Sequence, residues 1–175
     1  MIAAAEQAER DRVAAEEAAA EAARLKKIAS LPTHMRREIK RLTENPIIQG
    51  FDFSALLAAS VLESLADVES PTAWVACHVP EDKPKTVEII GSGAGGPAQL
   101  LPLLADDDVV FGALRVTAVD RTGVRVSLRS RMVYYYWNGA VVTSKTRFRN
   151  TDVIRAAAAY FMAPSLELKL NHDKT

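Results

Sequence analysis

The chain has 175 residues, a formal net charge of zero and a hydrophobic content of 49%, enough for one domain with a core and an appendage. Its single cysteine, Cys77, excludes an internal disulfide and favours a reducing compartment. No apolar run reaches the ~20 residues that cross a bilayer, and the acidic start resembles neither a signal peptide nor a transit peptide. We therefore expect a cytoplasmic protein without a membrane partner.

The zero net charge hides a segregated pattern. Residues 1–23 hold six acids and two bases, and residues 24–41 hold seven bases and one acid. Residues 63–120 are acidic, whereas residues 121–155 hold eight bases and only Asp152. The basic second half is either ordinary solvated charge or a face that steers and orients an acidic partner.

Residues 2–29 predict one long helix, since they contain neither Gly nor Pro and are rich in Ala, Glu and Arg. Its few large apolar residues, Ile2, Val13, Leu25 and Ile28, are too sparse for a self-sufficient coiled coil. The helix is therefore either solvated on its own or laid along a protein partner that supplies apolar surface.

A second, short helix is expected over residues 33–43, after Pro32, because Met35, Ile39 and Leu42 recur at helical spacing. Like charges at i,i+4 on its other face weaken an isolated helix, and an acidic partner would relieve them. The candidate partner-binding residues of this extension are Arg36, Arg37, Lys40 and Arg41.

The compact domain is expected over residues 51–171, between an extension of residues 1–50 and a tail of residues 172–175. It opens with a helix from Asp52 to about Leu65, because apolar residues recur at i,i+4. Alternating residues 73–79 and the run 85–90 predict a hairpin. A short helix interrupted by Pro102 follows, through Leu104.

Asp120–Gly123 has the pattern of a turn, and Asn138-Gly139 is a strong signal for a hairpin. Asn150 or Thr151 is expected to cap a helix that runs through Met162. The remaining strands are expected over residues 109–119, 124–137, 140–148 and 165–170. This order predicts an α+β fold of three layers, with a mixed sheet between helices.

The string GSGAGG, from Gly91 to Gly96, satisfies the dinucleotide pattern G-x-G-x-x-G, and Asp120 follows at a suitable distance. The helix after it is short and broken by a proline, and the chain lacks the alternating units of a doubly wound sheet. We interpret the string as a flexible loop and expect no cofactor.

The remaining candidates for chemistry have simpler explanations. His34, His78 and His172 are too dispersed to form a metal site, and Cys77 alternates with valines as a core residue does. Asp106–Asp108 could hold a cation but is better read as a solvated loop, and Tyr134–Tyr136 fit core packing better than stacking on bases. We expect neither catalysis nor nucleic-acid binding.

What remains is a group of basic residues expected around the predicted hairpin at Asn138-Gly139 and the helix after it. They form a plausible docking edge for an acidic surface. These candidate binding residues are Arg129, Arg131, Lys145, Arg147, Arg149 and Arg155.

Three strings carry a resemblance to a known family. RSRMVYYYWNG, VVFGALRVTAVD after the acidic pair Asp107-Asp108, and SKTRFRNTDVIRAAAAYF together resemble the actin-depolymerising-factor homology (ADF-H) family. Within this family the chain is most similar to coactosin. The resemblance covers about residues 51–171, and it implies a gelsolin-like mixed sheet and a domain that binds actin through its long helix.

By this resemblance, Arg131 matches the basic residue before the central strand, and Lys145 the lysine in the strand before the long helix. Arg155 matches the first basic residue of that helix, where Ala156–Ala159 replace the further lysines of depolymerising members. This departure and the long extension favour binding to the side of filaments over monomer binding and severing.

Two hypotheses follow. The first is a non-catalytic cytoskeletal protein that binds filamentous actin, or another acidic cytoskeletal polymer, through the basic group. The second is an ADF-H subunit that has lost actin binding and is anchored by its long N-terminal helix in a larger microtubule-based or axonemal assembly.

Overall fold

The computed structural model describes residues 2–122, 125–162 and 167–170. The chain forms two compact units, Met1–Arg37 and Glu38–Thr175. Helix α1 spans Ile2–Ser30, and α2 spans Thr33–Glu44, so both predicted N-terminal helices are confirmed. The predicted limits of extension, domain and tail stay predictions.

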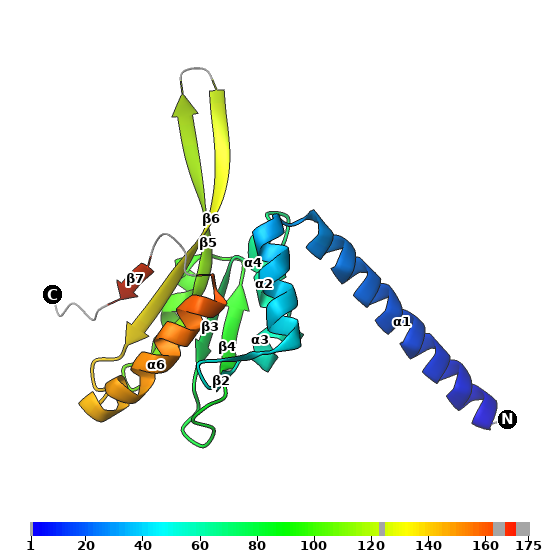
Figure 1. Cartoon of the computed structure of the whole chain (residues 1–175), viewed down its shortest axis with the longest axis horizontal. Helices are drawn as coiled ribbons and strands as arrows, with labels where there is room; N and C mark the ends of the chain where they lie inside the picture. Colours follow the sequence, from blue (N-terminus) through cyan, green and yellow to red (C-terminus); the bar gives the residue numbers. More distant parts are fainter. Residues whose placement is uncertain (1, 123–124, 163–166, 171–175) are drawn as a thin grey trace. The chain divides into compact units, whose positions relative to one another are not determined.

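The second unit is built on one mixed sheet (Figure 1). Its strand order is β4-β3-β5-β6-β7, and every neighbouring pair is antiparallel except the parallel pair β6 and β7. A separate two-stranded ribbon joins β1 (Ile47–Ile48) and β2 (Phe51–Asp52). The strands of the main sheet are β3 (Trp74–His78), β4 (Glu88–Gly93), β5 (Val109–Thr122), β6 (Arg125–Asn138) and β7 (Glu167–Leu170).

One face of the sheet is covered by α5 (Pro97–Leu100) and the 3-10 turn Leu101–Leu103. Leu100 is buried there in one cluster with sheet residues from β3, β5 and β6. Those sheet residues are Trp74, Ala76, Val110, Tyr135 and Trp137.

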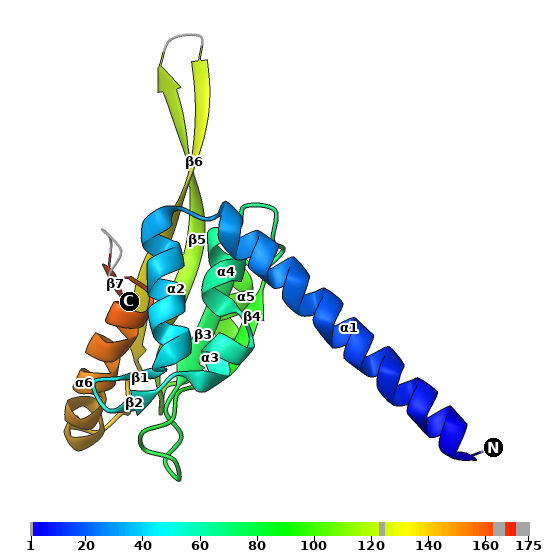
Figure 2. The ribbon, with the colours of Figure 1, turned by 45° about the vertical axis from the view of Figure 1, so that its right-hand side comes forward.

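The other face is covered by α3 (Ser54–Ala58), α4 (Val61–Ala66) and α6 (Ser144–Tyr160), which Figure 2 shows on the same side of the sheet. Tyr134 of β6 donates a hydrogen bond from Oη to the Ile154 carbonyl of α6 at 2.8 Å. Phe53 stacks on Tyr160 with ring centroids 4.9 Å apart. Helices on both faces of a mixed sheet confirm the predicted three-layer α+β fold.

The helix predicted from Asp52 to Leu65 is divided into α3 and α4. Ser60 lies between them with φ at 50°, a left-handed backbone conformation that interrupts the helix. The helix also starts later than predicted, because Asp52 lies in β2 and the N-cap of α3 is Phe53. Asp52 Oδ1 does accept a hydrogen bond from the Ser54 amide at 2.9 Å. Periodicity identified the apolar face but gave no sign of this break.

The prediction of a strand over residues 140–148, and with it a hairpin at Asn138-Gly139, is wrong. β6 ends at Asn138, and α6 already begins at Ser144 because Thr143 is its N-cap. Thr143 Oγ1 accepts a hydrogen bond from the Thr146 amide at 3.2 Å. Gly139 serves another purpose, since a Cβ there would lie 2.2 Å from the Asp106 carbonyl oxygen.

Gly112 of β5 leaves room for a hydrogen bond that joins β6 to β3 across β5. A Cβ at this position would lie 2.0 Å from the Val75 carbonyl oxygen and 2.9 Å from Tyr135 Oη. In the space left by the missing side chain, Tyr135 Oη of β6 donates a hydrogen bond of 2.9 Å to that carbonyl of β3. The residue therefore lets the outer two strands be joined over the middle one.

β5 and β6 continue far beyond the rest of the sheet as a two-stranded arm (Figure 1). β3 pairs with β5 only as far as Leu114, and β7 pairs with β6 only from Tyr134 onward. We call residues 115–122 of β5 and 125–132 of β6 the arm. Residues 120–122 belong to β5, so the turn predicted over Asp120–Gly123 is wrong for those three, and Gly123 lies outside the described residues.

Candidate functional site

Four basic residues of α6 are exposed, Lys145, Arg147, Arg149 and Arg155, and we call them the helix cluster. Arg147 and Arg155 line one hollow beside the helix and Arg149 lines another. The buried residues of the helix include Val153, Ala156, Ala157 and Tyr160. Alanines therefore stand where the helix packs closely inside the domain. This packing gives a physical reason for a run that replaces the further lysines expected by the resemblance.

The internal hydrogen bonds and ion pair of the helix cluster leave its side chains accessible to a partner. Arg147 donates from Nη2 to the carbonyls of Gly139 and Ala140 at 3.3 and 3.5 Å, which ties α6 to the preceding loop. Arg155 lies 3.9 Å from Asp152, and both side chains are more than two-thirds exposed. Among the described residues, Lys145 and Arg149 form no ion pair. The cluster can therefore face an acidic partner.

Two expectations for these residues are corrected. Lys145 was expected in a strand before the long helix, but it lies in the first turn of α6. Arg155 was expected as the first basic residue of the helix, but Lys145, Arg147 and Arg149 precede it there. The sequence offered a signal for this, because residues 144–160 contain neither Gly nor Pro.

An open groove of about 580 Å³ lies between α6 and the end of β6. Tyr136 and Asn138 line it from β6. The residues that line it from α6 are Arg147, Phe148, Thr151, Ile154 and Arg155. Phe148 is 84% exposed, the highest exposure among the large apolar side chains of the described chain. Sequence reasoning did not single out this residue or the groove.

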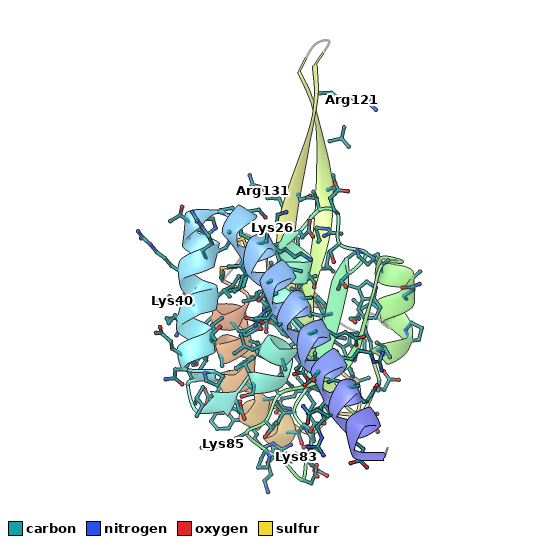
Figure 3. All side chains as sticks on the ribbon, turned by 90° about the vertical axis from the view of Figure 1, so that its right-hand side faces the viewer. Lys26, Lys40, Lys83, Lys85, Arg121 and Arg131 are labelled. Atoms are coloured by element: carbon teal, nitrogen blue, oxygen red, sulfur yellow. The ribbon has the colours of Figure 1, made fainter. Side chains whose placement is uncertain are left out.

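The arm holds the other two predicted binding residues. Arg131 is exposed and lies directly opposite Val116 in the register, and Figure 3 shows it on the arm together with Arg121. Arg129 lies in β6 opposite Ala118, and its side chain is outside the described part of the structure. Arg131 and Asn138, at the far end of β6, are seven positions apart, which is about 23 Å along a strand. The expected single edge is thus two separate basic surfaces.

A second hollow of about 350 Å³ lies beside the start of α6 and includes His78, Asp108 and Arg149 in its lining. His78 Nδ1 lies 2.7 Å from Asp108 Oδ2. The hydrogen bond to this carboxylate is the main cause that raises the pKa of His78, against the opposing effect of burial. The pair joins the end of β3 to the segment that precedes β5.

The residues considered for other chemistry lie in structural positions. Cys77 is buried, and burial raises the pKa of its thiol, so it holds no reactive thiolate. Tyr134 and Tyr135 are buried in the core as expected. His34 is exposed on α2, and His172 lies outside the described residues. Asp106 and Asp108 accept backbone hydrogen bonds from Val141 and Gly139, which anchors the loop before α6.

The interpretation of GSGAGG as a flexible loop is wrong for its first half, because Gly91 and Gly93 lie within β4. A Cβ at either position would lie within 3.0–3.4 Å of the Trp74 ring on the neighbouring strand. The helix that follows has four residues, so it provides little dipole for a phosphate. These glycines leave room for an indole ring.

The four candidate partner-binding residues of the extension all lie exposed on α2. Arg41 forms hydrogen bonds with Glu38, and Lys40 lies 3.9 Å from Glu44. These pairs offset part of the like-charge repulsion expected along this helix. Binding of an acidic partner by Arg36, Arg37, Lys40 and Arg41 stays a prediction.

Within residues 2–122, 125–162 and 167–170, no three His, Cys, Asp or Glu side chains come together as a set of metal ligands. In the same part of the chain, no helix combines the length and the apolar character that a membrane crossing demands.

Comparison with solved structures identifies the fold as that of the ADF-H domain. Coactosin from Entamoeba histolytica superposes with a TM-score of 0.58 at 21% identity, over 71% of this chain and 86% of that one. Human coactosin-like protein gives 0.56 at 22% identity, over 69% and 85%. Mouse coactosin, described as an actin filament binding protein, gives 0.50 at 20%, over 66% and 76%.

The model of one protein family, the cofilin/tropomyosin-type actin-binding proteins, matches residues 51–156. The chain belongs to this family, and its structural neighbours confirm the predicted likeness to coactosin. A search of curated proteins found no match.

Proposed function

We propose that this protein is a non-catalytic cytoskeletal protein that binds the side of actin filaments through the helix cluster and the arm. The observation that carries the proposal is the helix cluster itself. It is a set of exposed cations on the long helix of an ADF-H domain. Among the described residues, Arg155 is the one member of the set that forms an ion pair, and its pair with Asp152 is itself exposed. Membership of an actin-binding family supports the acidic filament as the partner.

We place the proposed site on two surfaces. The helix cluster lies on α6, and Arg131 with Arg129 lies on the arm. Exposed charges steer a partner and set its orientation, and salt screens them over about 8–10 Å. The proposed binding is therefore salt-sensitive, and it places the protein on the cytoskeleton.

The direct test is co-sedimentation of the full chain with actin filaments at low and at moderate salt. Lys145→Ala and Arg131→Ala are each expected to weaken pelleting several-fold and to reduce its salt dependence. Arg10→Ala, which removes an exposed arginine from α1, is the charge-matched control and should pellet like the wild type. Absence of pelleting at both salt concentrations would refute the proposal.

A second candidate function is supported by α1. Every described side chain from Glu6 to Ala23 on this helix is exposed, and a helix without an apolar face of its own can lie along a neighbour that supplies one. In this alternative the domain has lost actin binding and is a fixed subunit of a larger microtubule-based assembly. Two experiments separate the candidates. Failure of the full chain to pellet with actin filaments, together with its co-purification in a stable complex, would support this alternative. Loss of localisation on deletion of α1 (Ile2–Ser30), with filament binding intact, would instead show that α1 localises an actin-binding protein.

A further inference from the structure

The exposure of Phe148 is the starting observation. Its neighbours on α6 at positions 147 and 149 are arginines, and its ring is 84% exposed beside the groove that it helps to line. Complete burial of a phenylalanine side chain contributes about 1.5–3 kcal/mol relative to exposure. Phe148 contributes little of this to the folded chain, so the gain is available to a partner.

The groove beside Phe148 combines apolar and basic walls. Tyr136 and Ile154 provide apolar surface, while Arg147 and Arg155 provide guanidinium groups. Arginine is among the residue types enriched at the few interface positions that carry most of the binding energy, and an aromatic side chain adds a large apolar area to an interface. The groove is thus suited to a segment that carries a carboxylate close to apolar atoms.

We propose that Phe148 is the apolar anchor of the docking surface, and that the groove receives an acidic segment of the cytoskeletal polymer. The Phe148 ring enters an apolar depression on the polymer, and a carboxylate of the polymer lies against Arg147 and Arg155. This inference rests on the proposed function, and it adds to charge steering a contact that selects one acidic surface among many.

Charge steering and the Phe148 contact should affect binding in different ways. Exposed cations attract any acidic polymer, mainly by accelerating association and in a salt-dependent way. A buried aromatic ring slows dissociation and depends on shape, and salt hardly affects it. Phe148 should therefore determine which polymer the protein retains.

The test compares Phe148→Ala with Val141→Ala in co-sedimentation with actin filaments and, separately, with microtubules. Both variants remove an exposed apolar side chain, and Val141 is 68% exposed outside the groove lining. Alanine favours helix more than phenylalanine does, so Phe148→Ala keeps α6 folded. We expect Phe148→Ala to bind actin filaments about tenfold more weakly with an unchanged salt dependence, and Val141→Ala to bind normally.

The acidic segment in the groove is tested by an isosteric pair at Thr151. Thr151→Glu places a carboxylate among the groove residues, whereas Thr151→Gln has the same shape without the charge. We expect the Glu variant to pellet several-fold more weakly than the Gln variant.

The outcomes of these tests distinguish a failure of this inference from a failure of the proposed function on which it rests. Pelleting of the wild type with neither polymer would refute both. Pelleting of the wild type together with an unchanged Phe148→Ala variant, or with equal Glu and Gln variants at position 151, would refute this inference alone and leave binding by charge. Retention on microtubules in place of actin filaments, with loss in Phe148→Ala, would contradict the choice of actin.

Discussion

β5 and β6 pass through two different environments along their length. In the body of the domain, Phe111, Ala113, Val133 and Tyr135 are buried under helices on both faces of the sheet. In the arm beyond Arg115, the described residues of the two strands pair with each other, and Val116 and Val119 are 37% and 53% exposed. The ladder of hydrogen bonds continues unbroken across the change.

The difference shows that backbone pairing and side-chain burial are independent in this molecule. A two-stranded ribbon is marginally stable in water by itself, so the arm depends on its continuation into the layered body. Substitutions should therefore be costly in the body and nearly neutral in the arm beyond Arg115, whose side chain still contacts the body. The following predictions test this.

The largest effect is expected for Gly112→Ala in the body. The added Cβ would collide with the Val75 carbonyl, a backbone atom, and would displace the hydrogen bond from Tyr135. We expect the free energy of unfolding to fall by about 3 kcal/mol or more, measured by urea denaturation. Thr117→Ala, at an exposed position of the arm, should change it by less than about 0.5 kcal/mol. Similar losses in the two variants would contradict the comparison.

A smaller effect is expected for Arg115→Met, at the base of the arm. The Arg115 guanidinium donates to the carbonyls of Asp67 and Ser70, at the end of α4 and in the loop after it. Methionine keeps the apolar stem but leaves those carbonyls without this donor, at a cost of about 2 kcal/mol. If the arm draws its stability from this contact, hydrogen exchange in the arm should accelerate more than in β3. Equal acceleration would indicate a global effect.

The smallest effect is expected at the His78–Asp108 pair, and it depends on pH. Because the folded pKa of His78 lies above its ordinary value of 6.5, the stabilisation is fully present below that value. It is lost as the pH rises through the raised pKa. His78→Gln should therefore be less stable than the wild type by less than about 1 kcal/mol below pH 6.5. The gap in urea denaturation should close near pH 9, and a gap that widened with pH would exclude this assignment.

The sequence was sufficient where one pattern had one physical cause. The buried run Met132–Trp137 predicted a strand covered on both faces, and Val133, Tyr134, Tyr135 and Trp137 are buried there. The spacing of Met35, Ile39 and Leu42 predicted α2 to within one residue at its end. In such segments burial alone sets the spacing of apolar residues, so the spacing predicted the element correctly.

Prediction from the sequence failed where a residue is required by a contact with a segment distant in the chain. Asn138-Gly139 has the sequence of a tight turn, but Gly139 is required by the approach of Asp106, which no local pattern reveals. The first two turns of α6 expose Lys145, Arg147, Phe148 and Arg149 and so lack apolar periodicity, which concealed the beginning of the helix. The groove was missed for the same reason, since it depends on which residues of β6 lie beneath α6.

The hydrogen bond from Tyr135 to Val75 has a mechanical consequence for the arm. It fastens β6 to β3 across Gly112, two residues from where β3 stops supporting β5. A force applied to the arm would pass down both strands to this hydrogen bond, where three strands at the centre of the sheet share it. The bond therefore resists separation of the arm from the body.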